Sequence, residues 1–183
     1  NPSAVGVGWT VSDSTNYNGG YHLTGDEFYS VGPTVINNTM IYSASGVTRA
    51  GGGSTPLNAW YQIVRTYNGS NSATGYVNGV SLGTQTSAVG MPDVASVLRI
   101  GMYTDSPGDA GNNPFLLSNL RIVKGTAVYT GAFTPPTNIL RTTQASGTNI
   151  SALSGTETVL LTCQDSTFID KSASNFTITN NNS

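Results

Sequence analysis

Short runs of apolar, β-branched and aromatic residues alternate along this chain with clusters of Gly, Asn, Asp and Ser. No segment repeats apolar residues at the helical spacing of three and four, and Gly or Pro interrupts almost every stretch. This pattern predicts many short β-strands and excludes helix as a major element. The expected strands are 8–12, 20–24, 27–31, 34–36, 39–43, 59–67, 74–77, 80–84, 97–101, 115–123 and 158–163.

Two turns between these strands carry residues that adopt positive φ at low cost. Asn78-Gly79 separates Val77 from Val80, and this pair predicts a two-residue hairpin with a type I′ turn. A second hairpin is predicted at Asn37-Asn38, which also lies between two apolar runs. So many short antiparallel strands are typical of a sandwich or a barrel.

Two segments are expected to close the core of this fold. The strand at 59–67 has apolar or aromatic residues on both faces, which predicts a position inside a sheet and a buried Trp60. Residues 120–123 alternate as a strand with one buried face, and Tyr129 and Phe133 follow as anchors. The prolines at 135–136 lack backbone donors, so the chain is expected to leave the sheet there.

Composition changes the picture at the surface. Only 9% of the residues are charged, against about 25% in typical domains. Ser, Thr and Asn supply 64 of the 183 residues, so the surface is expected to be solvated by hydroxyl and amide groups. The net charge is −2 and the basic residues are scattered, which excludes a nucleic-acid partner. No apolar run is long enough to insert into a membrane. The single cysteine, Cys163, is expected to be a small buried side chain.

Four blocks in fixed order resemble a known family. They are "LNAWYQIVRTYNG", "GYVNGVSLGT", "LRIGMY" and "NLRIVKGTAVYTGAFTPPT". They are similar to the laminin-G-like, concanavalin A-like lectin and glucanase superfamily, especially to copies in structural and fibre proteins of bacteriophages. The resemblance implies an all-β fold, a jelly-roll β-sandwich of two antiparallel sheets, over residues 1–140. The opening "GDYL" and "FTIEFW" blocks of the family have no counterpart here, which points to truncated N-terminal strands.

The C-terminal part of the chain has a different character. Residues 141–155 are small and polar and are expected to form a linker. Residues 156–183 regain strand character at 159–162 and 176–179. This β-rich extension is expected either to start a further repeat, which it resembles, or to complete the sandwich.

Catalysis is not expected. Glucanases of the superfamily use paired carboxylates on one strand, whereas Glu27 and Glu157 have no acid two or four residues away on a strand. The only histidine, His22, cannot form a histidine metal triad. The chain is therefore expected not to be an enzyme.

The best candidate site is the loop "YTDSPGDAGNNPF". Its ligand-binding candidates are Tyr103, Asp105, Asp109, Asn112 and Asn113. Asp105 and Asp109 could hold calcium, as some laminin-G-like domains do, although the same residues also suit a plain turn or direct ligand contact. No other cofactor is expected.

The resemblance implies a non-catalytic structural or display module of a surface assembly, such as a phage-type fibre, tail or capsid-decoration protein. Its partners would be other copies of itself or neighbouring structural proteins, and it would lie on the virion surface or outside cells. The alternative is a carbohydrate-binding adhesion module that recognises a host or environmental glycan.

Overall fold

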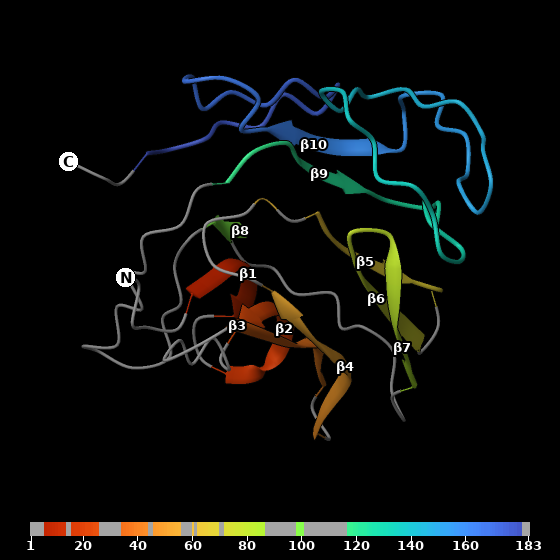
Figure 1. Cartoon of the computed structure of the whole chain (residues 1–183). Helices are drawn as coiled ribbons and strands as arrows, with labels where there is room; N and C mark the ends of the chain where they lie inside the picture. Colours follow the sequence, from red (N-terminus) through yellow and green to blue (C-terminus); the bar gives the residue numbers. More distant parts are fainter. Residues whose placement is uncertain are drawn as a thin grey trace. The chain divides into compact units, whose positions relative to one another are not determined.

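The structure, a computed structural model, describes residues 6–13, 16–25, 34–43, 46–55, 60, 62–69, 72–86, 98–100 and 117–180. The described chain contains antiparallel strands and no helix, which confirms the all-β class (Figure 1). None of these residues forms a helix with the length and apolar content that crossing a membrane requires. The strands are β1 (Gly6–Asp13), β2 (Asn16–Gly25), β3 (Thr34–Ser43), β4 (Gly46–Thr55), β5 (Ile63–Tyr67), β6 (Ser72–Val77), β7 (Val80–Thr86), β8 (Leu98–Ile100), β9 (Leu120–Val123) and β10 (Thr158–Thr162).

The chain divides into two compact units, Asn1–Phe115 and Leu116–Ser183. The first unit holds a five-stranded sheet in the order β4-β3-β2-β1-β8 and a three-stranded sheet in the order β5-β6-β7. Within this unit the two sheets contact one another through β4 and β7. The second unit holds the antiparallel pair β10-β9.

The hairpin between β6 and β7 is confirmed. Asn78 and Gly79 have φ values of 48° and 78°, as a type I′ turn requires at both central positions. The Asn78 side chain also accepts a hydrogen bond from the N–H of Gln62 at 2.9 Å. Asn78 therefore ties the start of β5 to the turn, in addition to shaping the turn itself.

The hairpin predicted at Asn37-Asn38 is wrong. β3 runs unbroken through both residues and pairs along its length with β4, with Asn37 opposite Gly52. β4 was not expected, because its sequence "GVTRAGGGST" lacks a run of β-branched residues. Its strand geometry is imposed by pairing with β3, since β propensity depends strongly on the neighbouring strand. The predicted strand at 27–31 lies outside the described residues.

The position predicted for Trp60 is also wrong. Its side chain is 65% exposed, and it precedes β5, which begins only at Ile63. Among the described strands β5 pairs with β6 alone, so it lies at the edge of its sheet rather than inside it. Apolar residues on both faces of a segment do not by themselves show that both faces are covered.

The core of the second unit contains the anchors that the sequence predicted. Tyr129 and Phe133 are 5% and 9% exposed, and their rings stack with centroids 3.7 Å apart. Cys163 is buried as expected. The core is formed by Leu120, Val128, Tyr129, Phe133, Leu153, Leu160, Leu161 and Cys163.

The strand predicted at 158–163 is confirmed as β10, which pairs antiparallel with β9, with Thr162 opposite Leu120. No strand forms at 176–179, where Phe176 is 58% exposed and donates its N–H to the Asp170 carboxylate.

Residues 141–155, predicted as a linker, contain antiparallel bridges from Gln144 to Leu153 and from Tyr129 to Ile150. Leu153 is 4% exposed, so this segment contributes to the core of its unit. The domain boundaries inferred from the sequence stay predictions.

Candidate functional site

The loop that the sequence favoured lies outside the described residues. This applies to Tyr103, Asp105, Asp109, Asn112 and Asn113 alike. The calcium site at this loop therefore stays a prediction. Among the residues that the structure does describe, no group of three or more His, Cys, Asp or Glu side chains could hold a metal ion.

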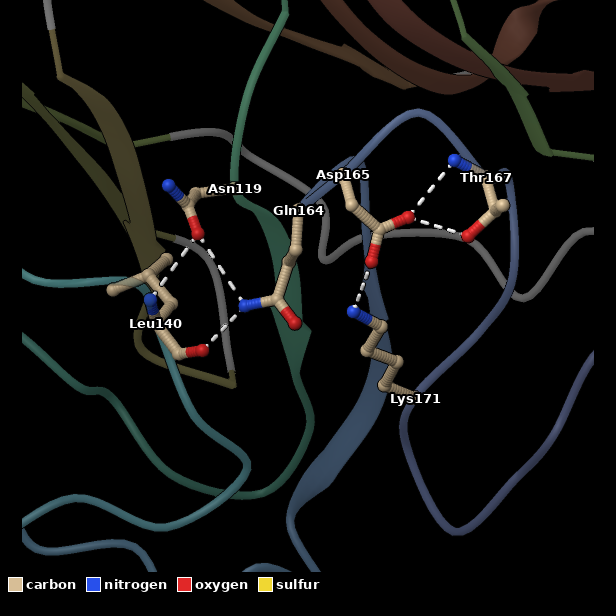
Figure 2. Close-up of polar contacts among 6 residues, drawn as sticks. All are labelled: Asn119, Leu140, Gln164, Asp165, Thr167 and Lys171. Carbon is tan, nitrogen blue, oxygen red and sulfur yellow. Dashed lines mark hydrogen bonds and ion pairs between the residues drawn. The ribbon is translucent and has the colours of Figure 1, made fainter.

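A polar cluster lies where β9 begins and β10 ends, and Figure 2 shows its side chains. Asn119 has a φ of 56° and donates its N–H to the Cys163 carbonyl at 2.8 Å. Its Oδ1 atom accepts the N–H of Leu140 at 3.2 Å and the Nε2 group of Gln164 at 3.3 Å. Gln164 Nε2 also donates to the carbonyl of Leu140. The amide side chains of Asn119 and Gln164 thus join three segments that are far apart in sequence, around residues 119, 140 and 164.

The cluster fixes which way the Gln164 amide faces. The Leu140 carbonyl can only accept a hydrogen bond, so the nitrogen of Gln164 must face it. Both N–H donors are then used, and the Oε1 atom points away from Asn119 and Leu140 (Figure 2). Gln164 therefore presents an oriented acceptor.

A shallow, open groove of about 770 Å³ lies beside this cluster, within the second unit. It is lined by Asn138, Ile139, Leu140, Arg141, Thr142, Thr143, Leu161, Gln164 and Lys171. The lining combines amides, hydroxyls, two cationic groups and three aliphatic side chains.

Side chains hold one wall of the groove in place. Residues 140–142 belong to no strand, yet each of their three carbonyl groups accepts a hydrogen bond from a side chain. The donors are Gln164 to Leu140, Arg121 Nη1 to Arg141 at 3.0 Å, and Thr158 Oγ1 to Thr142 at 2.8 Å. Satisfied backbone groups keep an irregular segment ordered.

Arg121, which is partly buried, also binds a second segment. Its Nη2 group also donates to Gln144 Oε1 at 2.7 Å. Burial lowers the pKa of its guanidinium, although neighbouring Tyr129 favours the charged form by charge interaction and hydrogen bonding. The guanidinium of Arg141, in contrast, is exposed and makes no hydrogen bond or ion pair to any residue that the structure describes. The guanidinium of Arg141 can therefore donate hydrogen bonds to a ligand in the groove.

The second cationic group of the groove already has a partner. Lys171 Nζ lies 2.6 Å from Asp165 Oδ2, and both side chains are partly exposed. Asp165 Oδ1 also accepts the N–H of Thr167 at 2.8 Å and its hydroxyl group (Figure 2). The hydrogen bond from Lys171 lowers the pKa of Asp165 most, followed by the hydrogen bonds from Thr167. Of the two cationic residues that line the groove, Lys171 is thus paired with a carboxylate, and Arg141 has no carboxylate partner among the described residues.

The other two carboxylates with described surroundings also bind their own chain. Asp170 is 6% exposed and accepts hydrogen bonds from Leu161 N, Ser172 N, Ser172 Oγ and Phe176 N at 2.8–3.0 Å. Burial raises the pKa of Asp170, but these hydrogen bonds outweigh it and the pKa lies below its ordinary value.

Glu157 binds the loop that precedes it. It accepts hydrogen bonds from the N–H and hydroxyl groups of Ser154 and from the N–H of Gly155. Its own backbone N–H lowers the pKa of its carboxyl most, followed by the Ser154 hydroxyl. Glu157 therefore has a structural role in the turn before β10.

Sequence reasoning missed the residues of this groove. Arg141 and Thr142 open the segment predicted as a linker, and Gln164 follows the predicted last strand. The one local signal was Asn119, since Asn is among the few residues that adopt positive φ readily. The contacts themselves join positions up to 45 residues apart, which no local pattern reveals.

Comparison with known proteins supports the family inferred from the four sequence blocks. A laminin-G family model, described as the Concanavalin A-like lectin/glucanases superfamily, matches residues 2–134. No curated protein and no solved structure matches the chain significantly. The match covers well over half of the 183 residues, and the described part of the matched region consists largely of antiparallel strands. The chain therefore belongs to the concanavalin A-like lectin/glucanase superfamily.

Proposed function

We propose that the chain is a non-catalytic structural and display module of a surface assembly, such as a phage-type fibre, tail or capsid-decoration protein. Its fold would be the two-sheet jelly-roll sandwich of its superfamily, and it would lie on the virion surface or outside cells. Its partners would be further copies of itself or neighbouring structural proteins. The observation that carries this proposal is the use of carboxylates as internal hydrogen-bond acceptors.

The described carboxylates of the second unit are all occupied in this way. Asp170 accepts four hydrogen bonds from its own chain, Glu157 holds the loop before β10, and Asp165 binds Thr167 and Lys171. A glycosidase needs two carboxylates facing one substrate, one of which acts as acid with a raised pKa. Here the pKa of each of the three is lowered instead, which favours structure over acid catalysis.

The outer edge of β10 is protected, as expected of a surface module that must not aggregate. Leu161 donates its N–H to Asp170 Oδ1 at 3.0 Å, and its carbonyl accepts the N–H of Lys171 at 2.8 Å. These contacts occupy backbone groups that a foreign strand would otherwise bind. Association with neighbouring copies is therefore expected to use side-chain surfaces rather than strand addition at Leu161.

The test combines an activity assay with a measurement of association. The purified chain is incubated with a panel of oligosaccharides and polysaccharides, and released reducing ends are counted. We expect no release above buffer. Sugar release that Glu27→Gln abolishes, while Asp165→Asn leaves it unchanged, would contradict the proposal. Sedimentation at increasing concentration should show self-association, and a strictly monomeric chain would count against packing between copies.

A second candidate function is carbohydrate binding, and the exposed side chain of Trp60 favours it. Trp60 is 65% exposed as a residue, and an exposed aromatic ring suits stacking on a sugar ring. The amide and hydroxyl lining of the groove in the second unit supplies groups that suit sugar hydroxyls. A glycan array tests this function with Trp60→Ala, Tyr103→Ala and Asp109→Ala. Sugar binding that Asp109→Ala and Tyr103→Ala both retain would remove the loop around these residues as the site.

A further inference from the structure

The groove of the second unit combines two cationic side chains, one of them paired with Asp165, with amide and hydroxyl groups. We propose that it binds an acidic carbohydrate, with the sugar carboxylate on the Arg141 guanidinium and the ring hydroxyls on the neighbouring amides and hydroxyls. This inference rests on the carbohydrate-binding candidate above and names its ligand class. The groove residues lie beyond residue 134, where the family match ends, so the match itself does not assign this site.

The first argument concerns charge. Lys171 is neutralised by Asp165 at 2.6 Å, whereas Arg141 has no anionic partner in the described part of the chain. A guanidinium binds a carboxylate through two parallel hydrogen bonds, which a neutral sugar cannot accept in the same way. A guanidinium that lines a groove without a carboxylate among the described residues therefore favours an anionic ligand there.

The second argument concerns rigidity. The carbonyls of Leu140, Arg141 and Thr142 are each held by a side chain from another segment. The backbone that carries Arg141 is thus fixed before any ligand arrives, although no strand supports it. Fixing the backbone of a binding residue in advance reduces part of the entropy that binding would otherwise cost.

The third argument concerns the uncharged groups. Gln164 Oε1 is an oriented acceptor because both amide donors are used by Leu140 and Asn119. Asn138 and Thr143 are exposed at the same groove and can both donate and accept. Ile139 is 61% exposed and offers an aliphatic surface. Acceptors, donors and an apolar patch beside a cation match a sugar that carries hydroxyls, C–H groups and a carboxylate.

The test measures binding of tri-galacturonate to the full chain by NMR titration of backbone amides. The matched neutral probe is a galactose trisaccharide, and acetate serves as the anion without a sugar. We expect tri-galacturonate to shift amides around residues 138–143 and 164, with weaker binding as salt rises. The galactose trisaccharide and acetate should bind at least about tenfold more weakly, since each offers only part of the contacts.

Two variants assign the effect to Arg141. Arg141→Gln should lower the affinity for tri-galacturonate at least about tenfold, as expected for loss of a charge-assisted hydrogen bond. Lys124→Gln removes the same charge from an exposed residue of the same unit that does not line the groove, and should change affinity less than about twofold. Because the Arg141 side chain makes no hydrogen bond or ion pair with any described residue, both variants should keep the unfolding temperature of the parent.

Several results would overturn the inference. Equal affinity of Arg141→Gln and the parent chain would show that the guanidinium does not recognise the ligand. If only the neutral trisaccharide binds, the chain would still be a carbohydrate-binding module, but the proposal that its ligand is acidic would be wrong. Absence of binding to both sugars, together with an unreactive glycan array, would end the carbohydrate candidate as well. Equal binding of acetate and tri-galacturonate would reduce the groove to a simple anion site.

Discussion

The buried carboxylate of Asp170 should contribute more to stability than any other acid with described surroundings. Its four hydrogen bonds join β10 to the segment that follows, through Leu161, Ser172 and Phe176. Replacing Asp170 with Ala removes the acceptor and leaves these N–H groups without a partner in a site that is 6% exposed. The perturbation therefore tests whether the C-terminal segment is held by this single side chain.

The magnitude follows from opposing contributions. A hydrogen bond to a charged group contributes about 1.5–3 kcal/mol, and bonds that share one acceptor are not additive. Removing the carboxylate also removes the cost of burying its charge. We therefore expect Asp170→Ala to lower the free energy of unfolding by about 3 kcal/mol net. Asp170→Asn keeps one acceptor oxygen but places an NH₂ group against other donors. It should lower the free energy of unfolding by about half as much as Asp170→Ala.

Urea unfolding followed by circular dichroism measures the loss, and hydrogen exchange locates it. With a slope of about 1.5 kcal/mol/M, Asp170→Ala should lower the urea midpoint by about 2 M. The amides of Leu161 and Phe176 should exchange faster in both variants. Asp165→Asn is the control, since it removes an exposed acid five residues away and should have a much smaller effect. Unchanged midpoints and unchanged exchange at Leu161 would refute the reasoning.

The pH dependence of the same variants gives an independent check. The folded-state pKa of Asp170 lies below its unfolded value, which is about 3.9. The stabilisation is therefore complete above the unfolded pKa and is lost as pH falls through the lower folded pKa. The difference in stability between the parent chain and Asp170→Asn should be constant near neutral pH and should shrink below about pH 4. A difference that stays constant down to pH 2 would contradict this assignment.

Three further predictions use other contacts of the described chain. Gly79→Ala should lower stability by about 1 kcal/mol in thermal unfolding, because Gly79 has a φ of 78°. Gly131→Ala should lower the unfolding temperature, because an added Cβ would lie 2.8 Å from Asn149 Cγ, and the double variant with Asn149→Ala should lose less than the sum of the two. Arg121→Gln should make residues 141–155 more susceptible to limited proteolysis, because it removes hydrogen bonds to this segment, while the same treatment of the parent chain should leave the segment intact.

Local chemistry made some elements predictable. The β6–β7 hairpin follows from two neighbouring residues, since Asn78 and Gly79 both tolerate positive φ. Tyr129 and Phe133 could be named as anchors because large aromatic residues near a strand end are usually buried. In each case the sequence signal and its structural result lie within a few residues of one another.

Other elements depend on partners that a local pattern does not contain. β4 is rich in Gly and forms a strand because β3 supplies its hydrogen bonds, while Asn37 lies within β3 rather than in a turn. Trp60 was predicted to be buried because both faces of the segment 59–67 carry apolar residues, yet burial depends on what lies against them. The groove was missed for the same reason, because pairing of β9 with β10 brings Asn119 and Gln164 together.

The low charge content of the chain gives its few ionic side chains distinct roles. Asp170 is buried and Arg121 partly buried, and both bind backbone or amide groups that no strand satisfies. Such groups need a partner wherever the chain is irregular, and a charged partner binds them more strongly than a neutral one. Asp165 and Lys171 neutralise one another at the surface. Arg141 fits neither role, since its carbonyl is held by Arg121 while its own guanidinium meets no acid in the described chain. Lys124 is exposed as well but does not line the groove, so what distinguishes Arg141 is its place among the amide and hydroxyl groups there, and Arg141→Gln is the variant that should reduce binding and leave stability unchanged.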